Sequence, residues 1–380
     1  MPVDRLLPTD EARELIHLTR EIADKALEPI VDHHERMETY PEGAFATLGA
    51  AGLLSLPYPE EWGGGNQPYE VYLQVLEEIA ARWAAVAVAV SVHSLACHPL
   101  MVFGTDAQKQ KWLPEMLSGT MIGAYSLSEP QAGSDAAALL CSATAVDNGY
   151  RVNGAKAWIT HGGIADFYTL FARTGKGAQG ISCFLVPKHT DGLTFGRPEE
   201  KMGLHAVPTT TAHYDDVFID RERRIGNEGQ GLPIAFSALD SGRLGIAAIA
   251  VGLAQAALDE AVSYSQQRTT FGRRIIDHQG LSFLLADMTA AVVSARATYV
   301  DAARRRDLGR PYSTQASVAK LVATDAAMKV TTDAVQVLGG VGYTRDYRVE
   351  RYMREAKITQ IFEGTNQIQR LVISRSLASG

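Results

Sequence analysis

The sequence predicts an α+β protein with a helical N-terminal domain, a middle antiparallel β-barrel or sandwich domain, and a C-terminal four-helix bundle. Its 380 residues exceed the roughly 250–300 that one hydrophobic core supports, so several packed units are expected. Apolar residues follow the helical period at both ends of the chain and form short β-rich runs between them. Because the helices flank the strands instead of alternating with them, a Rossmann sheet is disfavoured. We divide the chain into residues 1–120, 121–228 and 229–380.

The first 120 residues are predicted to be helical. Apolar side chains recur near the 3.6-residue period within residues 15–30, and Pro29 should end or kink that helix. A capping box at Thr105 predicts the start of a later helix, which we expect to stop at Gly119. The glycines at 63–65 predict a loop, because glycine holds regular structure only at an entropic cost.

The middle part is predicted to be a small antiparallel barrel or sandwich. Two hairpin signals stand close together, Asn148-Gly149 and Asn153-Gly154. Short runs with β-forming composition surround them, at residues 122–128, 157–160, 167–171, 181–186 and 209–219.

The last part is predicted to form a bundle, because long periodic segments are joined by short links. Breaks near Gly272, Gly309 and Gly339-Gly340 separate them. The predicted helices cover residues 246–264, 276–306, 313–338 and 365–377.

Composition limits the class of protein. With 36 Lys and Arg against 43 Asp and Glu, the net charge of −7 argues against a nucleic-acid surface, and 46% hydrophobic residues exclude disorder as the main state. The longest apolar candidate, 244–254, is shorter than the roughly 18 residues of a membrane span, so no span is predicted. Cys97, Cys141 and Cys183 give no disulfide framework, which fits a reducing compartment. Since no signal or transit peptide is recognisable, we expect a cytoplasmic protein or a trimmed precursor.

Common catalytic motifs are absent from the sequence. It holds no GxGxxG, Walker A or GxSxG segment, so any nucleotide cofactor must be held another way. Ser317 and Lys320 match SxxK, but in mid-helix and without partner motifs we interpret the match as chance. The run from His33 to Glu35 imitates metal-ligand spacing, yet it is more typical of the solvated end of an amphipathic helix. No metal site is predicted.

Five segments carry residues suited to chemistry. They are a strand end with a Pro/Gly loop, a tryptophan beside a hydroxyl, an arginine before a glycine, a glycine-rich turn, and a glutamate before a helix. Taken singly, each is typical of an ordinary turn, core residue, helix cap or helix dipole. They occupy residues 125–135, 157–163, 268–272, 336–343 and 361–370.

Taken together, these segments resemble the acyl-CoA dehydrogenase family, from about residue 10 to the C-terminus. Their joint occurrence is highly specific, whereas none is specific alone. The resemblance implies the same three-domain fold that the periodicity predicts. The characteristic stretches are YSLSEPQAGSD, AWIT, LDSGR, RTTFG, HQGLSFLLADM, QVLGGVGY and IFEGTNQIQRLVISR.

The resemblance implies a noncovalently bound FAD, with the flavin between the β domain and the C-terminal helices. The same chain would contact it through Tyr125, Leu127, Ser128, Trp158, Ile159, Thr160, Thr365 and Gln367. A neighbouring subunit would supply Arg268, Phe271, Gln279, Gln336, Leu338, Gly339 and Gly340. Sharing the cofactor implies an obligate oligomer, in this family a homotetramer. The acyl-CoA substrate would contact Ser134, Asp240, Arg243, Phe362 and Gly364.

The implied reaction is α,β-dehydrogenation of an acyl-CoA thioester to the trans-2-enoyl-CoA. Glu363 would take the α-proton as general base, and the β-hydrogen would leave as hydride to flavin N5. A ribityl hydroxyl of FAD and the backbone N–H of the base would stabilise charge on the thioester oxygen, and desolvation would raise the pKa of Glu363. Some family members carry the base after the LDSGR-like segment, but residues 239–243 hold no glutamate. An electron-transfer flavoprotein is the expected electron acceptor.

Some positions depart from the usual family pattern and bear on the CoA path and the β-domain loop: Gln131, His161, His205 and Val207. The alternatives are an acyl-CoA oxidase using O2, a flavin monooxygenase, and a non-catalytic scaffold. The first usually has an extra C-terminal domain, and the second typically lacks the base. Residues 239–261 and the SLSEP variant favour a short-chain, butyryl-type substrate, with branched and medium-chain substrates left open.

Overall fold

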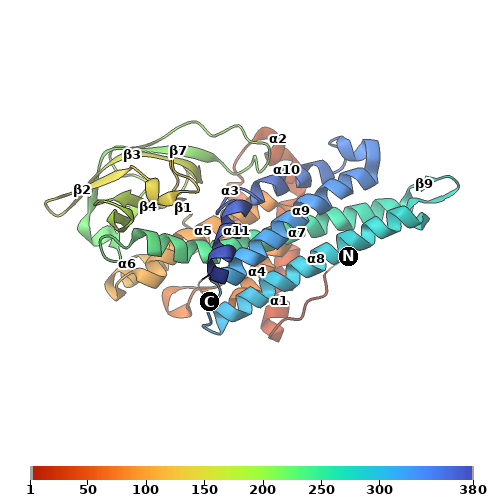
Figure 1. Cartoon of the computed structure of the whole chain (residues 1–380), viewed down its shortest axis with the longest axis horizontal. Coiled ribbons are helices and arrows are strands. Elements are labelled where there is room, and N and C mark those ends of the chain that lie inside the picture. The colour runs from red at the N-terminus through yellow and green to blue at the C-terminus, as the bar shows by residue number, and fades with distance from the viewer. Residues whose placement is uncertain (1–2, 379–380) are drawn as a thin grey trace.

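The computed structural model describes residues 3–378, with the sheet at one end of the long axis and the helices along the rest (Figure 1). The helix predicted within residues 15–30 is a longer helical run. It buries Ala12, Ile16 and Thr19 on one side and tightens into a 3₁₀ turn at Pro29. The N-terminal helices are α1 (Asp10–Ile22), a π-helical turn (Ala23–Leu27), a 3₁₀ turn (Glu28–Ile30), α2 (Val31–Met37), α3 (Glu42–Ala50), α4 (Tyr69–Arg82), α5 (Ala84–Phe103) and α6 (Asp106–Met116).

The capping box predicted at Thr105 is confirmed. The Thr105 hydroxyl accepts from the Gln108 N–H, and the Gln108 amide oxygen accepts from the Thr105 N–H. The helix ends at Met116, before Gly119, which has a positive φ of 80°. Helices α4 and α5 were not resolved individually from the sequence, because they are buried nearly all round and show no one-faced apolar pattern.

The middle domain is an eight-stranded, mainly antiparallel sheet in the order β6-β7-β3-β2-β4-β5-β8. Strand β1 pairs with β4 in parallel, which the residue pattern did not show. The hairpin predicted at Asn148-Gly149 is confirmed as the β2–β3 turn. The strands are β1 (Gly123–Ser126), β2 (Ser142–Val146), β3 (Gly149–Thr160), β4 (Phe167–Arg173), β5 (Ile181–Pro187), β6 (Leu193–Phe195), β7 (Thr209–Asp220) and β8 (Arg224–Ile225).

The second predicted hairpin, Asn153-Gly154, is wrong. Both residues lie inside β3, where the pairing with β7 shifts between Val152 and Gly154. Gly154 has φ 147°, and a Cβ there would lie 2.7 Å from Cys141 Cα. The glycine therefore serves a bulge and a close backbone approach, the other common use of glycine in a strand.

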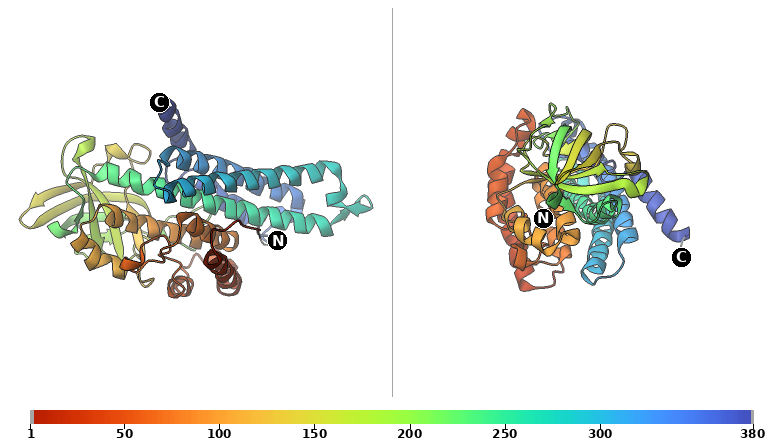
Figure 2. Two further views of the ribbon diagram at one scale, coloured as in Figure 1. Left: turned by 90° about the horizontal axis from the view of Figure 1, so that it is seen from below. Right: turned by 90° about the vertical axis from the view of Figure 1, so that its left-hand side faces the viewer.

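The C-terminal domain is built around the long helix α7. The third helix predicted for this domain, 313–338, coincides with α9. The first, predicted at 246–264, corresponds to α7, which begins earlier, at Gly231. Helix α10 was not predicted. It packs against α7 and α9, whereas α11 packs against α9 and projects from the body (Figure 2). The elements are α7 (Gly231–Gln267), β9 (Thr269–Thr270), β10 (Arg273–Arg274), α8 (Gln279–Asp307), α9 (Ser313–Leu338), a 3₁₀ turn (Gly339–Tyr343), α10 (Val349–Thr359) and α11 (Asn366–Ala378).

Helix α7 also joins the domains. It packs against α4 and α5 of the N-terminal domain as well as against α8, α9 and α10. One continuous core contains residues from the N- and C-terminal helices, and a second joins α5 and α6 to the sheet and to the start of α7. The segment of α7 that includes residues 239–243 therefore lies where the three domains meet.

By length and composition alone, α5, α7 and α8 could each cross a membrane, so the prediction that no apolar stretch reaches this length is wrong. The apolar windows of α5 and α7 are 78% buried inside the protein, which makes them core helices. The window of α8 is only 22% buried, and Phe283 and Val293 are more than half exposed on it.

Candidate active site

Glu363 lies in the tight turn between α10 and α11. Its φ is 52°, and that of Gly364 is 91°, so two consecutive residues take the left-handed region. For a residue with a side chain this conformation costs roughly 1–2 kcal/mol and persists only where surrounding contacts enforce it. Asn366 N–H donates to the Gln360 carbonyl, and Thr365 Oγ1 accepts from the Ile368 N–H at the start of α11. The turn is thus fixed at both ends.

The carboxylate of Glu363 points against α7. Its Oε2 is buried and has no hydrogen-bond partner within residues 3–378. A Cβ built on Gly242 would lie 2.1 Å from that oxygen, so only glycine at this position leaves room for the carboxylate. The LDSGR-like segment therefore supplies the wall of the site, a role that its sequence alone did not reveal.

Burial raises the pKa of Glu363 to about 7, against the lowering effect of Lys320 and then Arg243. A carboxyl group that titrates near neutrality matches what a general base needs, because enough carboxylate is present and it still holds a proton well. Arg243 is buried and forms an ion pair with Asp240 at 2.6 Å. The two residues assigned to the CoA portion thus bind each other, and Arg243 Nε has no partner among the described residues.

A cavity of about 10 Å³ adjoins Gly242, close to the volume of one water molecule. The guanidinium of Arg306 stacks over the Tyr69 ring at 3.7 Å and forms part of its lining. Tyr69 itself donates to the Ser241 carbonyl at 2.9 Å. Other lining residues are Tyr58, Ser91, Ser94, Leu95 and His98. A space this small holds about one water molecule, and an acyl group could enter it only if its walls moved.

Two of the predicted segments come together at the edge of the sheet. The Ala157 N–H donates to the Ser128 carbonyl at 2.9 Å, which joins the strand end of residues 157–163 to the loop of 125–135. Lys156 Nζ donates to the Leu127 carbonyl at 3.0 Å and pairs with Glu129 at 2.8 Å. Both charged side chains are buried, so this ion pair holds the loop in one arrangement.

Trp158 is 63% exposed and has φ 63°, at a break in the β3–β7 register between Lys156 and Ile159. The strand thus turns a large flat ring outward, beside the half-buried hydroxyl residue Thr160. An exposed indole at a strand end fits stacking against a planar cofactor such as a flavin. Leu127, Ile159 and Leu338 are buried by their own chain.

The remaining cofactor residues lie elsewhere. Arg268 and Phe271 belong to the β9–β10 hairpin, which lies at the end of the molecule opposite the sheet (Figure 1). Phe271 is 96% exposed, and a Cβ on Gly339 or Gly340 would touch nothing within 4 Å. Gln279 and Gln336 are exposed too. One chain therefore does not bring this set to Glu363.

The other predicted contacts have simple placements. Ser134 is exposed on the loop after β1, and Gln367 is exposed on α11. Phe362, Gly364 and Thr365 are half-buried around Glu363.

The departures from the family pattern make their own contacts. His161 is buried with φ 65°, and its Nδ1 lies 3.0 Å from the Gly123 carbonyl. Gln131 donates to Glu129 at 2.6 Å, and Val207 accepts from Lys201 through its carbonyl. The His205 backbone N–H donates to the buried Glu35 carboxylate at 2.9 Å.

Glu35 corrects one prediction. It is buried between Trp83 Nε1 and the His205 N–H, so the interpretation of residues 33–35 as a solvated helix end is wrong for this residue. No group of three or more His, Cys, Asp or Glu side chains that could hold a metal ion occurs within the described residues. The three cysteines are free and buried.

Sequence reasoning missed Lys320. The lysine is fully buried on α9, and its Nζ donates to the Gly364 carbonyl at 2.9 Å. A signal existed, because Lys320 shares an apolar helix face with Ala316, Ala323 and Ala327, where a solvated lysine would be out of place.

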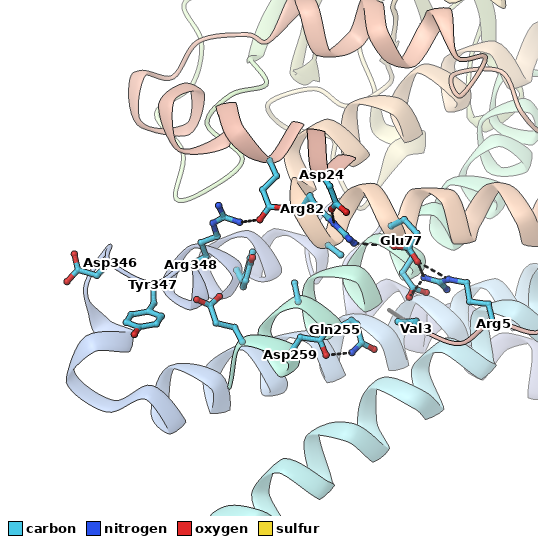
Figure 3. A pocket seen from close by; sticks show the side chains of 16 residues that line it. Val3, Arg5, Asp24, Glu77, Arg82, Gln255, Asp259, Asp346, Tyr347 and Arg348 are labelled. Atoms are coloured by element: carbon cyan, nitrogen blue, oxygen red, sulfur yellow. Dashed lines mark hydrogen bonds and ion pairs between the residues drawn. The ribbon is translucent and has the colours of Figure 1, made fainter. Parts of the chain in front are cut away.

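A second cavity, of about 640 Å³, lies between the N-terminal segment, α4 and α7 (Figure 3). It contains none of the predicted site residues. Several of its charged side chains pair with one another, as Arg5 does with Glu77 and Arg82 with Asp24.

Comparison with known proteins places these features in context. Acyl-CoA dehydrogenase family models match the N-terminal domain at residues 9–120, the middle domain at 124–217 and the C-terminal domain at 229–378. A short-chain specific acyl-CoA dehydrogenase of Megasphaera elsdenii is 42% identical over 376 residues, covering 97% of this chain and 98% of that protein. The solved butyryl-CoA dehydrogenase from Megasphaera elsdenii is similar with TM-score 0.96 and 41% identity, over 99% of this chain and 100% of that one. A chain in the structure described as the electron transferring flavoprotein of Acidaminococcus fermentans is similar with TM-score 0.97 and 42% identity, over 100% of both chains.

Proposed function

The chain belongs to the acyl-CoA dehydrogenase family, and we propose that it performs FAD-dependent α,β-dehydrogenation of a short-chain acyl-CoA to the trans-2-enoyl-CoA. The observation that carries the proposal is the Glu363 carboxylate. Its Oε2 is buried without a hydrogen-bond partner among the described residues and lies where a side chain on Gly242, which lines the small cavity, would collide with it. A buried acceptor with nothing to accept from is costly unless a ligand uses it.

Glu363 takes the α-proton of the thioester. Its pKa of about 7 lets a substantial fraction be carboxylate at neutral pH while keeping the group basic. The negative charge that develops on the thioester oxygen needs a hydrogen-bond donor. The Glu363 N–H could serve as that donor, because no hydrogen bond within residues 3–378 uses it. Bound FAD would supply the acceptor for the β-hydrogen, which leaves as hydride. The protein's share is to orient the thioester, exclude water and hold the proton.

Two sets of residues would hold FAD. Around the flavin, the strand-end segment with Trp158 and the loop with Tyr125, Leu127 and Ser128 lie together and are braced by the Lys156–Glu129 pair. Thr365 and Gln367, at the start of α11, would serve the nucleotide part. The residues of the β9–β10 hairpin and the end of α9 would reach the FAD of a second copy, since they lie at the opposite end of their own chain.

The assembly that follows is a homotetramer. The exposed apolar surface of α8 supports it, because only 22% of its apolar window is buried by its own chain. Exposed apolar surface on this scale marks an interface more often than a free face. We place the enzyme in the cytoplasm, with an electron-transfer flavoprotein as electron acceptor.

The acyl group would be short. The cavity next to Gly242 has room for little more than one water molecule, and Arg306 and Tyr69 lie in its wall. The preference for a butyryl chain over an octanoyl chain is supported by the short-chain specific and butyryl-CoA dehydrogenase relatives, because the cavity admits neither chain unless its walls move.

The test is anaerobic mixing of the holoenzyme with butyryl-CoA while the flavin absorbance is followed. Rapid bleaching is expected, with slower bleaching for longer acyl chains. A purified protein that holds no flavin, or a flavin that no acyl-CoA bleaches, would contradict the proposal. Rapid stoichiometric peroxide formation in air would instead identify an oxidase.

A further inference from the structure

We propose that Lys320 is a positioning residue for proton abstraction. Its ammonium group fastens the turn that carries Glu363 and presents a positive charge to that carboxylate. The inference rests on the proposed role of Glu363 as the base and goes beyond it, since it assigns a function to a residue that touches neither substrate nor cofactor.

The contacts of Lys320 are specific. Its Nζ donates to the Gly364 carbonyl at 2.9 Å and to Asn366 Oδ1 at 2.8 Å. Asn366 in turn donates to Thr324 Oγ1 at 2.9 Å and to Asp325 Oδ1 at 2.7 Å. Both of these partners lie one turn further along α9. A single helix therefore holds the residues immediately after Glu363 through side chains.

The Gly364 carbonyl has a second donor. Gln369 Nε2 binds it at 2.9 Å. Two donors on one carbonyl fix the Gly364–Thr365 peptide plane, which directly follows two residues with positive φ, 52° at Glu363 and 91° at Gly364. Because such a conformation reverts when its supports are lost, the direction of the Glu363 side chain depends on these bonds.

Packing alone does not explain a lysine at this position. Lys320 is 0% exposed and lies on the face of α9 that also buries Ala316, Ala323 and Ala327. Burying an ammonium group is expensive unless it is fully bonded, whereas methionine or leucine would fill the space without that cost. The charge and its donors are therefore the property that the site uses.

The charge acts on Glu363 directly. Burial lowers the pKa of Lys320 to about 7, and Glu363 raises it in part. Burial raises the pKa of Glu363, and Lys320 opposes that rise more than Arg243 of α7 does. The other groups near the carboxylate are Tyr69 and Tyr72 of α4 and Tyr125 of β1, whose pKa values burial raises, so they stay neutral at pH 7. Asp325 faces Lys320, and Asp240 pairs with Arg243.

The direction of the effect follows from these charges. With Lys320 charged, the carboxylate form of Glu363 is favoured. Without it, desolvation is opposed only by Arg243, so the pKa of Glu363 rises and less base is present at neutral pH.

The experiment compares Lys320→Gln, which keeps a donor but loses the charge, with Lys320→Met, which loses both. Lys329→Gln is the matched control, because Lys329 lies on the same helix with its side chain 61% exposed. FAD content and melting temperature are measured first. The rate of anaerobic flavin reduction is then measured as a function of pH. The carboxyl band of Glu363 is titrated by infrared spectroscopy, with the spectrum of Glu363→Gln subtracted to identify it.

In Lys320→Gln we expect two midpoints to move upward by about one pH unit, that of the reduction rate against pH and that of the infrared titration of Glu363. In Lys320→Met the plateau rate should fall further, by about tenfold or more, with little change in KM. Lys329→Gln should match wild type. Unchanged midpoints in folded, FAD-loaded Lys320 variants would overturn the inference, and so would failure of both variants to fold, since Lys320 would then be structural. If Glu363→Gln reduces its flavin normally, the proposed function fails instead.

Discussion

The two ends of the C-terminal helical domain differ in how completely one chain builds them. At the inner end, next to the sheet, Glu363 is enclosed by Gly242, Arg243 and Lys320, and its Oε2 is buried without a hydrogen-bond partner among the described residues. At the outer end, the β9–β10 hairpin and the end of α9 leave Phe271 96% exposed and Gly339 without neighbours. The inner end has the features of a complete site, whereas the outer end has the features of a partial site that needs a second chain.

This difference separates two tasks. In the proposed function the inner end would take up a proton, which demands a fixed carboxylate within a fraction of an ångström. The outer end offers exposed donors and a flat ring to a ligand that a second copy would bring. We therefore expect substitutions at the inner end to reduce the rate of chemistry while FAD stays bound. Substitutions at the outer end should release FAD while the chemistry of any loaded site is spared.

The largest effect is expected from Glu363→Gln. The amide keeps the size of the side chain but cannot accept the α-proton, so flavin reduction should slow by about 10²–10⁴-fold. FAD content and the spectral shift on ligand binding should match wild type. The check is anaerobic stopped-flow absorbance with butyryl-CoA, and a rate within tenfold of wild type would mean that Glu363 is not the base.

Gly242→Ala should come next. The added Cβ would lie 2.1 Å from Glu363 Oε2 and 3.1 Å from Leu95 Cδ1, so the carboxylate must move. A displacement of that size costs about 10²-fold in rate while leaving FAD bound. Gly43→Ala is the control, because a Cβ on that helical glycine meets nothing within 4 Å. Wild-type kinetics in the Gly242 variant would show that the carboxylate works from another position.

Arg268→Ala tests the outer end. Loss of a charge-assisted hydrogen bond to a phosphate should weaken FAD retention by about tenfold or more. Arg274→Ala serves as control in the same hairpin, because Arg274 pairs locally with Asp277. Dialysis followed by the ratio of flavin to protein absorbance gives the result. Equal retention in both variants would remove Arg268 from the cofactor site.

The smallest effect concerns a buried carboxylate away from both ends. Glu355 of α10 is fully buried, has no hydrogen-bond partner among the described residues, and burial raises its pKa from 4.5 to about 8. Because its pKa is raised on folding, the folded state holds the extra proton. The contribution of Glu355 to stability is therefore fully present below pH 4.5 and is lost as pH rises to about 8.

Glu355→Gln should remove the loss of stability that comes from ionising this buried carboxyl group. Its melting temperature should exceed that of wild type by a few degrees above about pH 8, and the difference should shrink toward acid. Glu350→Gln on the same helix, which loses only its ion pair with Arg354, should show no such growth with pH. A difference that is constant with pH would mean that Glu355 is ionised throughout.

Much of the fold was predictable, and the misses have physical causes. Residues 313–338 show a clear period and form α9, whereas α5 is apolar all round and offers no period to detect. Helix α10 buries Arg351 and Glu355 along with its apolar residues, which dilutes the pattern. The Asn153-Gly154 pair is a good turn signal that β7 overrides by pairing across it.

The site residues also divide into those that the sequence could predict and those that it could not. Glu363 and Trp158 stand in recognisable segments, so their candidacy could be read along the chain. The roles of Gly242 and Lys320 depend on which helix faces the turn after α10, and no local pattern carries that information. The SxxK match was interpreted as chance because it lies in mid-helix without partner motifs, and a lone lysine in a helix is usually solvated.

The central claim is that a working site joins the inner end of one chain to the outer end of another, and mixed oligomers test it most directly. Glu363→Gln and Arg268→Ala chains carrying different tags are co-expressed, and oligomers containing both are isolated. A site with Glu363 from the Arg268→Ala chain and Arg268 from the Glu363→Gln chain has both residues intact. We predict that the mixed oligomers retain FAD and reduce it with butyryl-CoA at the wild-type rate in the intact sites, although each parent variant is defective. Mixed oligomers no more active than the parents would contradict the account, since each chain would then need its own Arg268 beside its own Glu363.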